Sequence, residues 1–290
     1  MDNRHMQIDP RIQRRLDLCL FGLLATGGIL FLVHGCQAVT AAWDWQALFR
    51  AFFRLEEGQG IVPGPLGRGL ITTLRLAVWT FGFSLLFGFL LGLVRSLCAR
   101  PLRMFGAVIV ALTRNLPPLV LVFIVHYFLS GALAVSLDWQ WASRVPGAGI
   151  LLPEASGMPV FVSAVITLSL YEGAYIGEIV RAGVAGVARE QWDAAASLGF
   201  SRLAALRLVI LPQAFRFMLP PLAGQMASLI KDSAVVSVIS VRELTFQGTE
   251  FMASSGLTGE VWLAVSACYL CLCLGVSLIG RLLEKRCKWA

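Results

Sequence analysis

The sequence predicts an all-α integral membrane protein with six transmembrane helices. The first reason is composition: 57% of the 290 residues are hydrophobic and 14% are charged, and the mean hydropathy is +0.75. One aqueous globule could not bury that much apolar surface. The second reason is the recurrence of apolar stretches close to the roughly 20 residues that a bilayer core requires. Six such stretches occupy residues 18–36, 76–94, 115–137, 159–180, 217–241 and 261–280.

The third reason is the distribution of basic residues, which accumulate on the cytoplasmic side of membrane proteins. With the N-terminus in the cytosol, the cytoplasmic segments hold about two thirds of the 24 Lys and Arg residues, and the outer segments hold roughly a fifth. This imbalance predicts a multi-pass protein of the inner membrane with both termini in the cytoplasm. The net charge of +7 then reflects topology, and nucleic acid is not expected as a partner.

These stretches divide the chain into five expected parts. They are a cytoplasmic tail at 1–15, an additional N-terminal transmembrane helix at 16–39, an extracytoplasmic interfacial segment at 40–69, a membrane domain at 70–284 with a cytoplasmic loop at 185–212, and a cytoplasmic tail at 285–290. The first apolar stretch is long for a signal peptide and lacks a well-placed cleavage site. We therefore expect it to be retained as a helix.

The outer segments carry aromatic residues typical of the membrane interface. In residues 43–54 the aromatic side chains follow a helical period with charges between them, which predicts a short interfacial helix. Residues 58–69 are rich in Gly and Pro and predict a loop. A second outer loop at 130–158, with Trp139 and Trp141, is also expected at the interface.

The cytoplasmic loop at 185–212 carries the clearest pattern. Residues 189–199 favour a helix that ends at Gly199, because the left-handed cap costs glycine little. Ser201 suits the N-cap of a second helix, which is expected to reach Leu211 and to be interrupted at Pro212. Two short helices joined at a glycine form a rigid unit that a soluble partner could move. The sequence contains no Gly-rich P-loop motif for ATP, so ATP-driven work would need another chain.

The residues of this loop match a known pattern. Asp193-Ala194-Ala195, three residues, Gly199, nine residues and then Val209-Ile210-Leu211-Pro212 resembles the EAA loop of ABC importer permeases. That family pattern is Glu-Ala-Ala, three residues, Gly, nine residues and Ile-x-Leu-Pro. Asp193 replaces the usual Glu and Val209 the usual Ile, which keeps charge or shape. Glu190 stands where the amino-acid subfamily often has Gly.

Flanking segments narrow the resemblance to the polar amino-acid permeases for histidine, glutamine, arginine and opines. The similar segments are Thr72-Thr73-Leu74, residues 114–120, residues 173–184, Lys231-Asp232-Ser233 and Glu243-Leu244. The resemblance covers about residues 69–286. It implies a type I permease core of five helices, to which the first helix is an addition, and transport by alternating access without chemistry in this chain.

The resemblance also implies partners. They are a second permease subunit (identical or paralogous), two ABC ATPase subunits, an extracytoplasmic solute-binding protein, the amino-acid substrate and membrane lipids. ATP and Mg would be bound by the ATPase, and this chain would hold no cofactor and no metal. The residues expected to couple to the ATPase are Glu190, Asp193, Ala194, Ala195, Gly199, Val209, Leu211 and Pro212.

Charged residues inside the apolar stretches need a reason, because a charge at the bilayer centre costs a few kcal/mol. Lys231 and Asp232 could line the translocation path or the dimer interface, or could form a local ion pair in a broken helix; both interpretations stay open. Glu172 could neutralise Lys231 or Arg114, which is the favoured interpretation, or attract a cationic amino acid. Arg114 precedes Pro117-Pro118, which predicts a helix break beside a substrate path or a packing kink.

Other residues favour structural roles. Glu178 and Arg181 are three apart, a spacing that permits an ion pair that would position the cytoplasmic loop. His126 is expected to be a core histidine, and Cys268, Cys271 and Cys273 are expected to be packing residues rather than metal ligands. The alternative function is a secondary transporter or channel that uses the intramembrane charges, which would need no large helical loop. A membrane enzyme would need clustered His, Asp or Cys.

Overall fold

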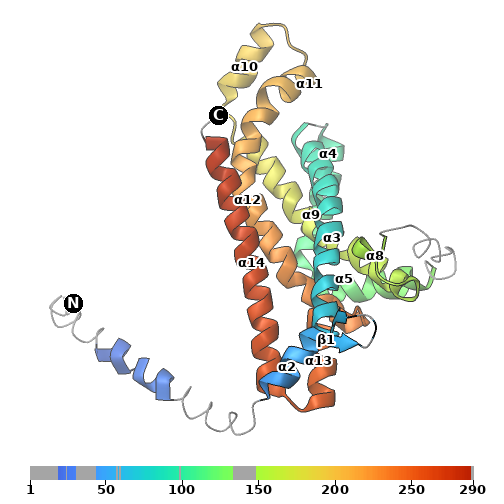
Figure 1. The fold of residues 1–290 in the computed structure, drawn as a ribbon. Helices are drawn as coiled ribbons and strands as arrows, with labels where there is room; N and C mark the ends of the chain where they lie inside the picture. Colours follow the sequence, from blue (N-terminus) through green and yellow to red (C-terminus); the bar gives the residue numbers. More distant parts are fainter. Residues whose placement is uncertain are drawn as a thin grey trace, which may run out of the picture. The chain divides into compact units, whose positions relative to one another are not determined.

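The computed structural model describes residues 19–23, 25–30, 44–56, 58, 60–97, 99–132 and 148–288. Two compact units are distinguished, Met1–Gln46 and Ala47–Ala290. The described part of the first unit contains a short apolar helix within Cys19–Leu30. The second unit is almost entirely helical (Figure 1). The expected cytoplasmic tail at 1–15 and the tryptophans Trp139 and Trp141 lie outside the described residues.

Most of a short helix and a hairpin lie at the start of the second unit. Helix α2 (Trp45–Phe52), whose first two residues belong to the first unit, leads into strand β1 (Phe53–Glu56), which pairs antiparallel with β2 (Gly60–Pro63). The short helix predicted within 43–54 is present, but the loop predicted at 58–69 is wrong. Part of that segment is β2, and helix α3 (Pro65–Leu97) already begins at Pro65. Proline suits the first turn of a helix, where its missing N–H leaves no bond unmade.

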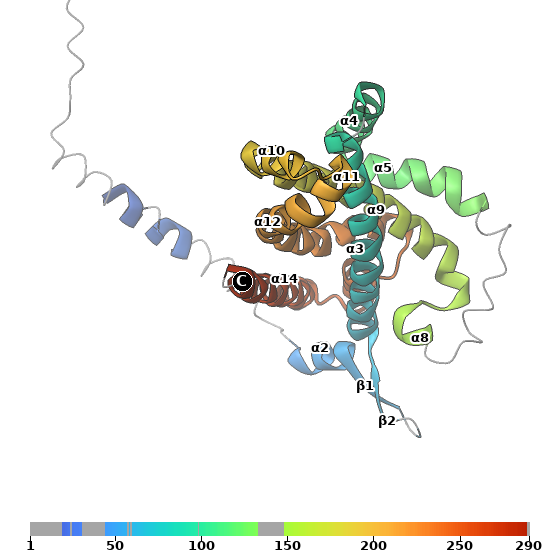
Figure 2. The same ribbon diagram turned by 90° about the horizontal axis from the view of Figure 1, so that it is seen from above.

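Helix α9 (Met158–Ala185) is the centre of the second unit. In its most apolar window 67% of the residues are buried, compared with 33% for α3 and 6% for α14 (Thr258–Lys288). Helix α3 packs closely against α9: a Cβ added at Gly88 would lie 2.7 Å from the Gly173 carbonyl oxygen. Small residues at such contacts let helix backbones approach in membranes. Helices α4, α5 and α12 contact α9 on its other sides (Figure 2).

Four helices are long and apolar enough to cross a membrane, namely Pro65–Leu97, Met158–Ala185, Arg202–Ile239 and Thr258–Lys285. A fifth span requires that α4 (Arg100–Asn115) and α5 with its continuation to Phe128 count as one broken span. Within the described residues the structure thus supports four or five spans. The expectation of six also depends on the first apolar stretch, residues 18–36, part of which is outside the described residues.

The span predicted at 115–137 is broken near its start. Helices α4 and α5 (Pro118–Val125) meet at an angle of 107°, and α4 lies almost entirely between the spans predicted at 76–94 and 115–137. Leu116 has an extended backbone (ψ 138°), as does Pro117 (ψ 134°). Both precede a proline, which disfavours helical backbone at that position. The break predicted at Pro117-Pro118 is therefore confirmed.

Helix α5 continues as the π-helical segment η2 (His126–Ser130). His126 is half-buried, and its Nδ1 lies 3.4 Å from the Ser163 hydroxyl of α9, in agreement with the expected core histidine. Beyond residues 133–147 the chain resumes as α8 (Ala148–Leu151) and the 3₁₀ turn η3 (Ala155–Gly157). The Trp79 indole donates to the Leu151 carbonyl at 3.0 Å, which holds α8 against α3.

The C-terminal part contains the 3₁₀ helix η5 (Ser233–Ile239), α13 (Leu244–Ser255) and α14. Buried Glu243 caps α13: its Oε1 accepts from the Phe246 N–H at 2.8 Å, and its Oε2 accepts from the Thr245 N–H at 2.9 Å. The Tyr269 hydroxyl of α14 also donates to Oε2, at 2.7 Å. One carboxyl group therefore joins the start of α13 to α14.

Cys268, Cys271 and Cys273, the three closely spaced cysteines of α14, do not form a metal site. Cys268 and Cys273 are half-buried and Cys271 is exposed. In the part of the chain that the structure describes, no group of three His, Cys, Asp or Glu residues is placed to hold a metal ion.

Candidate functional site

The loop at 185–212 folds as two helices around a glycine, as its sequence predicts. Helix α10 (Arg189–Ser197) is followed by Gly199 at φ 80° and by α11 (Arg202–Ala205). The Gly199 N–H donates to the Ala196 carbonyl at 2.9 Å, and the Phe200 N–H donates to the Ala195 carbonyl at 3.1 Å. These two bonds form a Schellman motif. The Ser201 hydroxyl accepts from the Ala204 N–H at 3.3 Å, which confirms the predicted N-cap.

The interruption predicted at Pro212 is wrong. The π-helical segment η4 (Leu206–Ile210) runs directly into α12 (Leu211–Asp232), in which Pro212 lies in the first turn. A wider π turn precedes the proline, so the chain stays helical although Pro212 lacks an N–H. Residues 202–239 therefore form one continuous helical span. The loop is consequently in direct mechanical continuity with a membrane helix.

One face of the loop packs on the rest of the molecule. Ala195 is 2% exposed and Ile210 is fully buried. Leu206 and Ile210 belong to a buried cluster with Val184 of α9 and Met218 of α12, and Trp192 packs against it. A hydrogen bond of 3.2 Å from Gln213 to Gln191 also joins α12 to α10. The structure thus holds the loop firmly against the ends of α9 and α12.

The other face of the loop is open. Of the predicted coupling residues, Ala195 is buried, Val209 and Leu211 are half-buried, and the rest are exposed: Glu190, Asp193, Ala194, Gly199 and Pro212. An added Cβ at Gly199 would meet nothing within 4 Å. Glycine is needed there for its left-handed backbone and not for space.

Glu178 links two helices beneath this loop. Its Oε1 accepts from the Arg181 guanidinium at 2.5 and 2.9 Å, which is the ion pair that the spacing predicts. Its Oε2 accepts from Arg95 of α3 at 2.5 Å. Arg95 was missed from the sequence because it is 83 residues away from Glu178. The carboxylate thus bridges α3 and α9 at the end nearest the loop.

Glu172 is fully buried in the middle of α9. Its Oε2 accepts from the Gln225 amide of α12 at 2.5 Å, and its Oε1 has no hydrogen-bond partner among the described residues. The carboxyl group of Asp232 interacts with it. The expected neutralisation of Glu172 by Lys231 or Arg114 is wrong, since no ion pair between described residues joins them. The close packing of α9 against α12 brings an amide to Glu172 instead.

The other charged residues predicted inside or at the edge of the apolar stretches are Arg114, Lys231 and Asp232. The Arg114 guanidinium lies 4.8 Å from the centre of the Tyr175 ring, a cation–π contact. The Tyr175 hydroxyl lies 3.3 Å from that of Tyr171, one turn earlier on α9. Lys231 is exposed and Asp232 half-buried, at the junction of α12 and η5. A cavity of about 470 Å³ between α4 and α9 is lined by Arg95, Arg114, Tyr175 and Glu178, among others.

Two groups therefore emerge: Glu172 with Gln225 and Asp232, and Arg114 with Tyr175. Sequence reasoning missed Gln225, Tyr171 and Tyr175. The tyrosines are spaced one helical turn apart and flank Glu172 on α9, which is a signal that periodicity could have provided. Gln225 had no such signal, because its relation to Glu172 depends on helix packing.

Comparison with known proteins identifies the family. The sequence family described as "Binding-protein-dependent transport system inner membrane component" matches residues 84–289. The chain is 34% identical to the L-cystine transport system permease protein TcyB of Bacillus subtilis, over 76% of this chain and 86% of that one. It is 32% identical to the glutamine transport system permease protein GlnP of Escherichia coli K12, over 85% and 98% of the two chains.

Solved structures agree with this result. A chain from the crystal structure of an amino acid ABC transporter with histidines is 27% identical, with a TM-score of 0.62 over 77% of this chain and 94% of that one. A chain of the inward-facing MetNI methionine ABC transporter, at 16% identity and a TM-score of 0.63, shares the fold. The chain therefore belongs to the family of inner membrane components of binding-protein-dependent transport systems, the multi-pass permease subunits of ABC importers.

Proposed function

We propose that this permease carries polar amino acids into the cell and that the α10–α11 loop is the surface on which a separate ABC ATPase acts. The observation that carries the proposal is the loop itself: two helices capped around Gly199, packed by one face and open on the other. The amino-acid substrate class is supported by relatives named for cystine and glutamine transport.

The loop is well placed to transmit force. On one side only three residues separate α10 from α9, and on the other α11 continues through η4 into α12. Glu178 further ties the end of α9 to α3 through Arg95. A displacement of the loop would therefore move α9 and α12 together. Such rigid-body motion between two packed states is the usual basis of alternating access.

The assembly we propose contains a second permease subunit, two ATPase subunits that bind ATP and Mg, and an extracytoplasmic solute-binding protein. Both termini lie in the cytoplasm, with the retained helix at 16–39 added to a core at 70–284. Glu190, Asp193 and Ala194 are the exposed residues of α10 that would face the ATPase. Buried Ala195 would hold α10 on the permease.

We place the substrate path beside Arg114, Glu172, Lys231 and Asp232. The Oε1 atom of Glu172 has no hydrogen-bond partner of good geometry among the described residues, and the carboxyl group of Asp232 lies nearby. Buried carboxyl groups inside a membrane protein are costly and commonly mark substrate or ion pathways. They suit the ammonium group of an amino acid, whereas the Arg114 guanidinium suits its carboxylate.

The test is ATP-driven uptake by the complex, co-expressed with its ATPase and binding protein and reconstituted into liposomes. Gly199→Ala strains a backbone at φ 80°, and Asp193→Ala removes the exposed charge. We expect each to lower ATP-dependent uptake at least tenfold without loss of membrane insertion. Gly256→Ala is the matched control, because Gly256 has φ 76° and also has open space around it, but it lies in the α13–α14 turn.

Full uptake by both loop variants would contradict the coupling role of the loop. Uptake that needs an ion gradient and no ATP would instead favour the alternative of a secondary transporter.

A further inference from the structure

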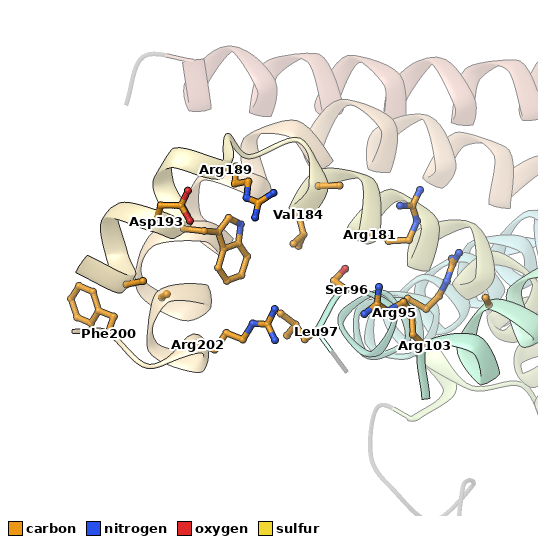
Figure 3. A pocket seen from close by; sticks show the side chains of 15 residues that line it. Arg95, Ser96, Leu97, Arg103, Arg181, Val184, Arg189, Asp193, Phe200 and Arg202 are labelled. Atoms are coloured by element: carbon orange, nitrogen blue, oxygen red, sulfur yellow. The ribbon is translucent and has the colours of Figure 1, made fainter. Parts of the chain in front are cut away.

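A second, larger cavity lies between the α10–α11 loop and the adjoining ends of the membrane helices. Its volume is about 790 Å³. Five of the residues that line it are arginines: Arg95, Arg103, Arg181, Arg189 and Arg202. Figure 3 shows Arg189 and Arg202 on the side of α10 and α11, and Arg95, Arg103 and Arg181 on the opposite side. The arginines thus converge from five different helices.

The charge of this cavity is not balanced by its own lining. Asp193 is the acidic residue among the lining residues, and Glu178, just outside it, bridges Arg95 and Arg181. Even without Arg103, four guanidinium groups against these two carboxylates leave an excess of two positive charges. Like charges gathered in one cavity repel each other, and an anion that enters it relieves this repulsion.

Guanidinium groups favour one kind of anion. Their planar array of N–H donors matches phosphate and carboxylate oxygens in a bidentate manner, which an ammonium group cannot do. Side chains on opposite walls could contact different oxygens of one phosphate group. The volume lies within the range of about 300–1,000 Å³ that small-molecule sites occupy, so a phosphate with an attached glycerol fits.

The position of the cavity indicates where that phosphate comes from. Leu97 and Arg95 lie in the last turns of α3, Arg181 lies near the end of α9, and Arg103 lies in the first turn of α4. The cavity therefore opens where membrane spans end, at the level of lipid headgroups. Trp192, which also lines it, is the residue type enriched at that level.

An apolar surface adjoins the cavity. Helix α4, which supplies Arg103 to the lining, exposes large hydrophobic side chains along its length: Leu102 (53% exposed), Met104 (68%), Phe105 (67%), Val108 (54%) and Leu112 (61%). Acyl chains would cover this surface while their headgroup lies among the arginines. A free phosphate ion would make no use of it.

We propose that this cavity binds the phosphate group of an anionic phospholipid and thereby braces the α10–α11 loop against α3 and α4. Glu190, Ala194 and Ser197 of α10 do not line the cavity, and Asp193, which does, is also exposed to solvent. Lipid binding at the inner face and contact with a soluble protein at the outer face are thus compatible. The inference does not depend on the transported substrate.

The test compares two double variants of the full permease chain purified in mild detergent. Arg189→Gln with Arg202→Gln removes two arginines of the cavity. Arg100→Gln with Arg207→Gln removes two exposed arginines of the same region that do not line it, with the same change in net charge. Retained phosphatidylglycerol is counted by native mass spectrometry, with phosphatidylcholine as the zwitterionic reference.

We expect the cavity variant to retain phosphatidylglycerol at least tenfold more weakly than the wild type, since a basic residue near a lipid headgroup contributes about fivefold. The control variant should behave like the wild type, and phosphatidylcholine should show no difference. Titration with inorganic phosphate separates the two sources of the anion. If the ion alone stabilises the wild type against heat and phosphatidylglycerol does not, the cavity is a site for free phosphate.

Equal retention of phosphatidylglycerol by both double variants would overturn the proposal, as would a loss common to both. Exclusion of the lipid when the ATPase binds would overturn it too, because the arginines would then serve the protein contact. The lipid measurement needs neither ATP nor substrate. A permease that retains the lipid but fails in uptake would therefore contradict the proposed transport function alone.

Discussion

The α10–α11 loop follows α9 and Glu172 lies within α9, yet the two regions depend on different kinds of interaction. The shape of the loop is set by local bonds: a cap at Ser201, a glycine turn at Gly199, and carbonyl groups only a few residues away. Glu172 has its hydrogen-bond partner 53 residues away on another helix. The loop has an exposed face that can accept a partner, whereas Glu172 is fully buried.

This difference predicts how each region responds to substitution. The loop should tolerate changes on its open face with little loss of stability, and changes there should act on coupling. Substitutions at Glu172 and its neighbours should change stability and transport together. One oxygen of the Glu172 carboxyl group accepts from Gln225, and the other has no hydrogen-bond partner among the described residues. The following predictions test that contrast, in order of decreasing effect.

The largest effect on stability is expected where the loop is anchored. Ala195→Asp would bury a charge at a position that is 2% exposed, and an unpaired buried charge costs several kcal/mol. We expect the substitution to lower the thermal unfolding temperature strongly in detergent. The matched control is Ala194→Asp, the same change at the exposed neighbouring position. Equal destabilisation by both would show that the loop is not docked as described.

The next largest effect is expected for substitutions of Glu172. Glu172→Leu leaves the half-buried Gln225 amide without this acceptor, which costs up to about 1–3 kcal/mol. Glu172→Gln keeps an oxygen for that bond and should be distinctly more stable, as thermal unfolding would show. Both variants lose the carboxyl group, so we expect both to lower amino-acid uptake. If Glu172→Gln transports normally, the carboxyl group of Glu172 has no part in the path.

The ion pairs of Glu178 are expected to contribute less to stability, because solvent partly screens them. The Arg95 side chain is 13% exposed and that of Arg181 is 39% exposed, and exposed ion pairs contribute about 0–1 kcal/mol. Arg95→Gln should therefore destabilise the protein by about 1 kcal/mol and Arg181→Gln by less. A double-mutant cycle with Glu178→Gln measures each pair. A larger coupling for Arg181 would contradict this ranking.

The smallest effect concerns pH. Burial raises the pKa of Glu243 above its ordinary value, although the N–H groups of Thr245 and Phe246 and the Tyr269 hydroxyl oppose this shift. A carboxyl group with a raised pKa in the folded state stabilises the fold below its ordinary pKa, about 4.3. That contribution is lost as the pH rises through the folded pKa. We expect Glu243→Gln to flatten the fall in stability between the ordinary pKa and the folded-state pKa of Glu243, measured as unfolding temperature against pH. An unchanged profile would show that other groups cause the fall.

The sequence alone was sufficient for the features that depend on neighbouring residues. Apolar stretches predicted α3, α9 and α14, because a bilayer demands long helices whose backbone bonds are made internally. The pair Pro117-Pro118 predicted the break between α4 and α5, and Gly199 with Ser201 predicted the loop. Each of these signals lies within one continuous segment, so the residues that cause the structure are neighbours in the chain.

The predictions from the sequence were wrong where a proline or a glycine is compatible with two different local structures. Pro212 and Pro65 both indicate the end of a helix or its first turn, and the structure shows the first turn in each case. The Gly- and Pro-rich stretch after residue 57 indicated a loop, yet part of it pairs as β2. Which meaning holds depends on what the flanking segments contact, and composition does not contain that information.

The tertiary structure alone decided the partners of the charged groups. Glu178 pairs with Arg95, and Glu172 with Gln225, across helices that are far apart in the sequence. The arginines of the large cavity come from two separate segments, α3–α4 and α9–α11. Their contacts depend on which faces of α3, α9 and α12 meet, which is set by close packing at small residues such as Gly88 and Gly173. Local periodicity determines that a helix forms and how long it is, whereas packing between helices determines what each of its charges meets.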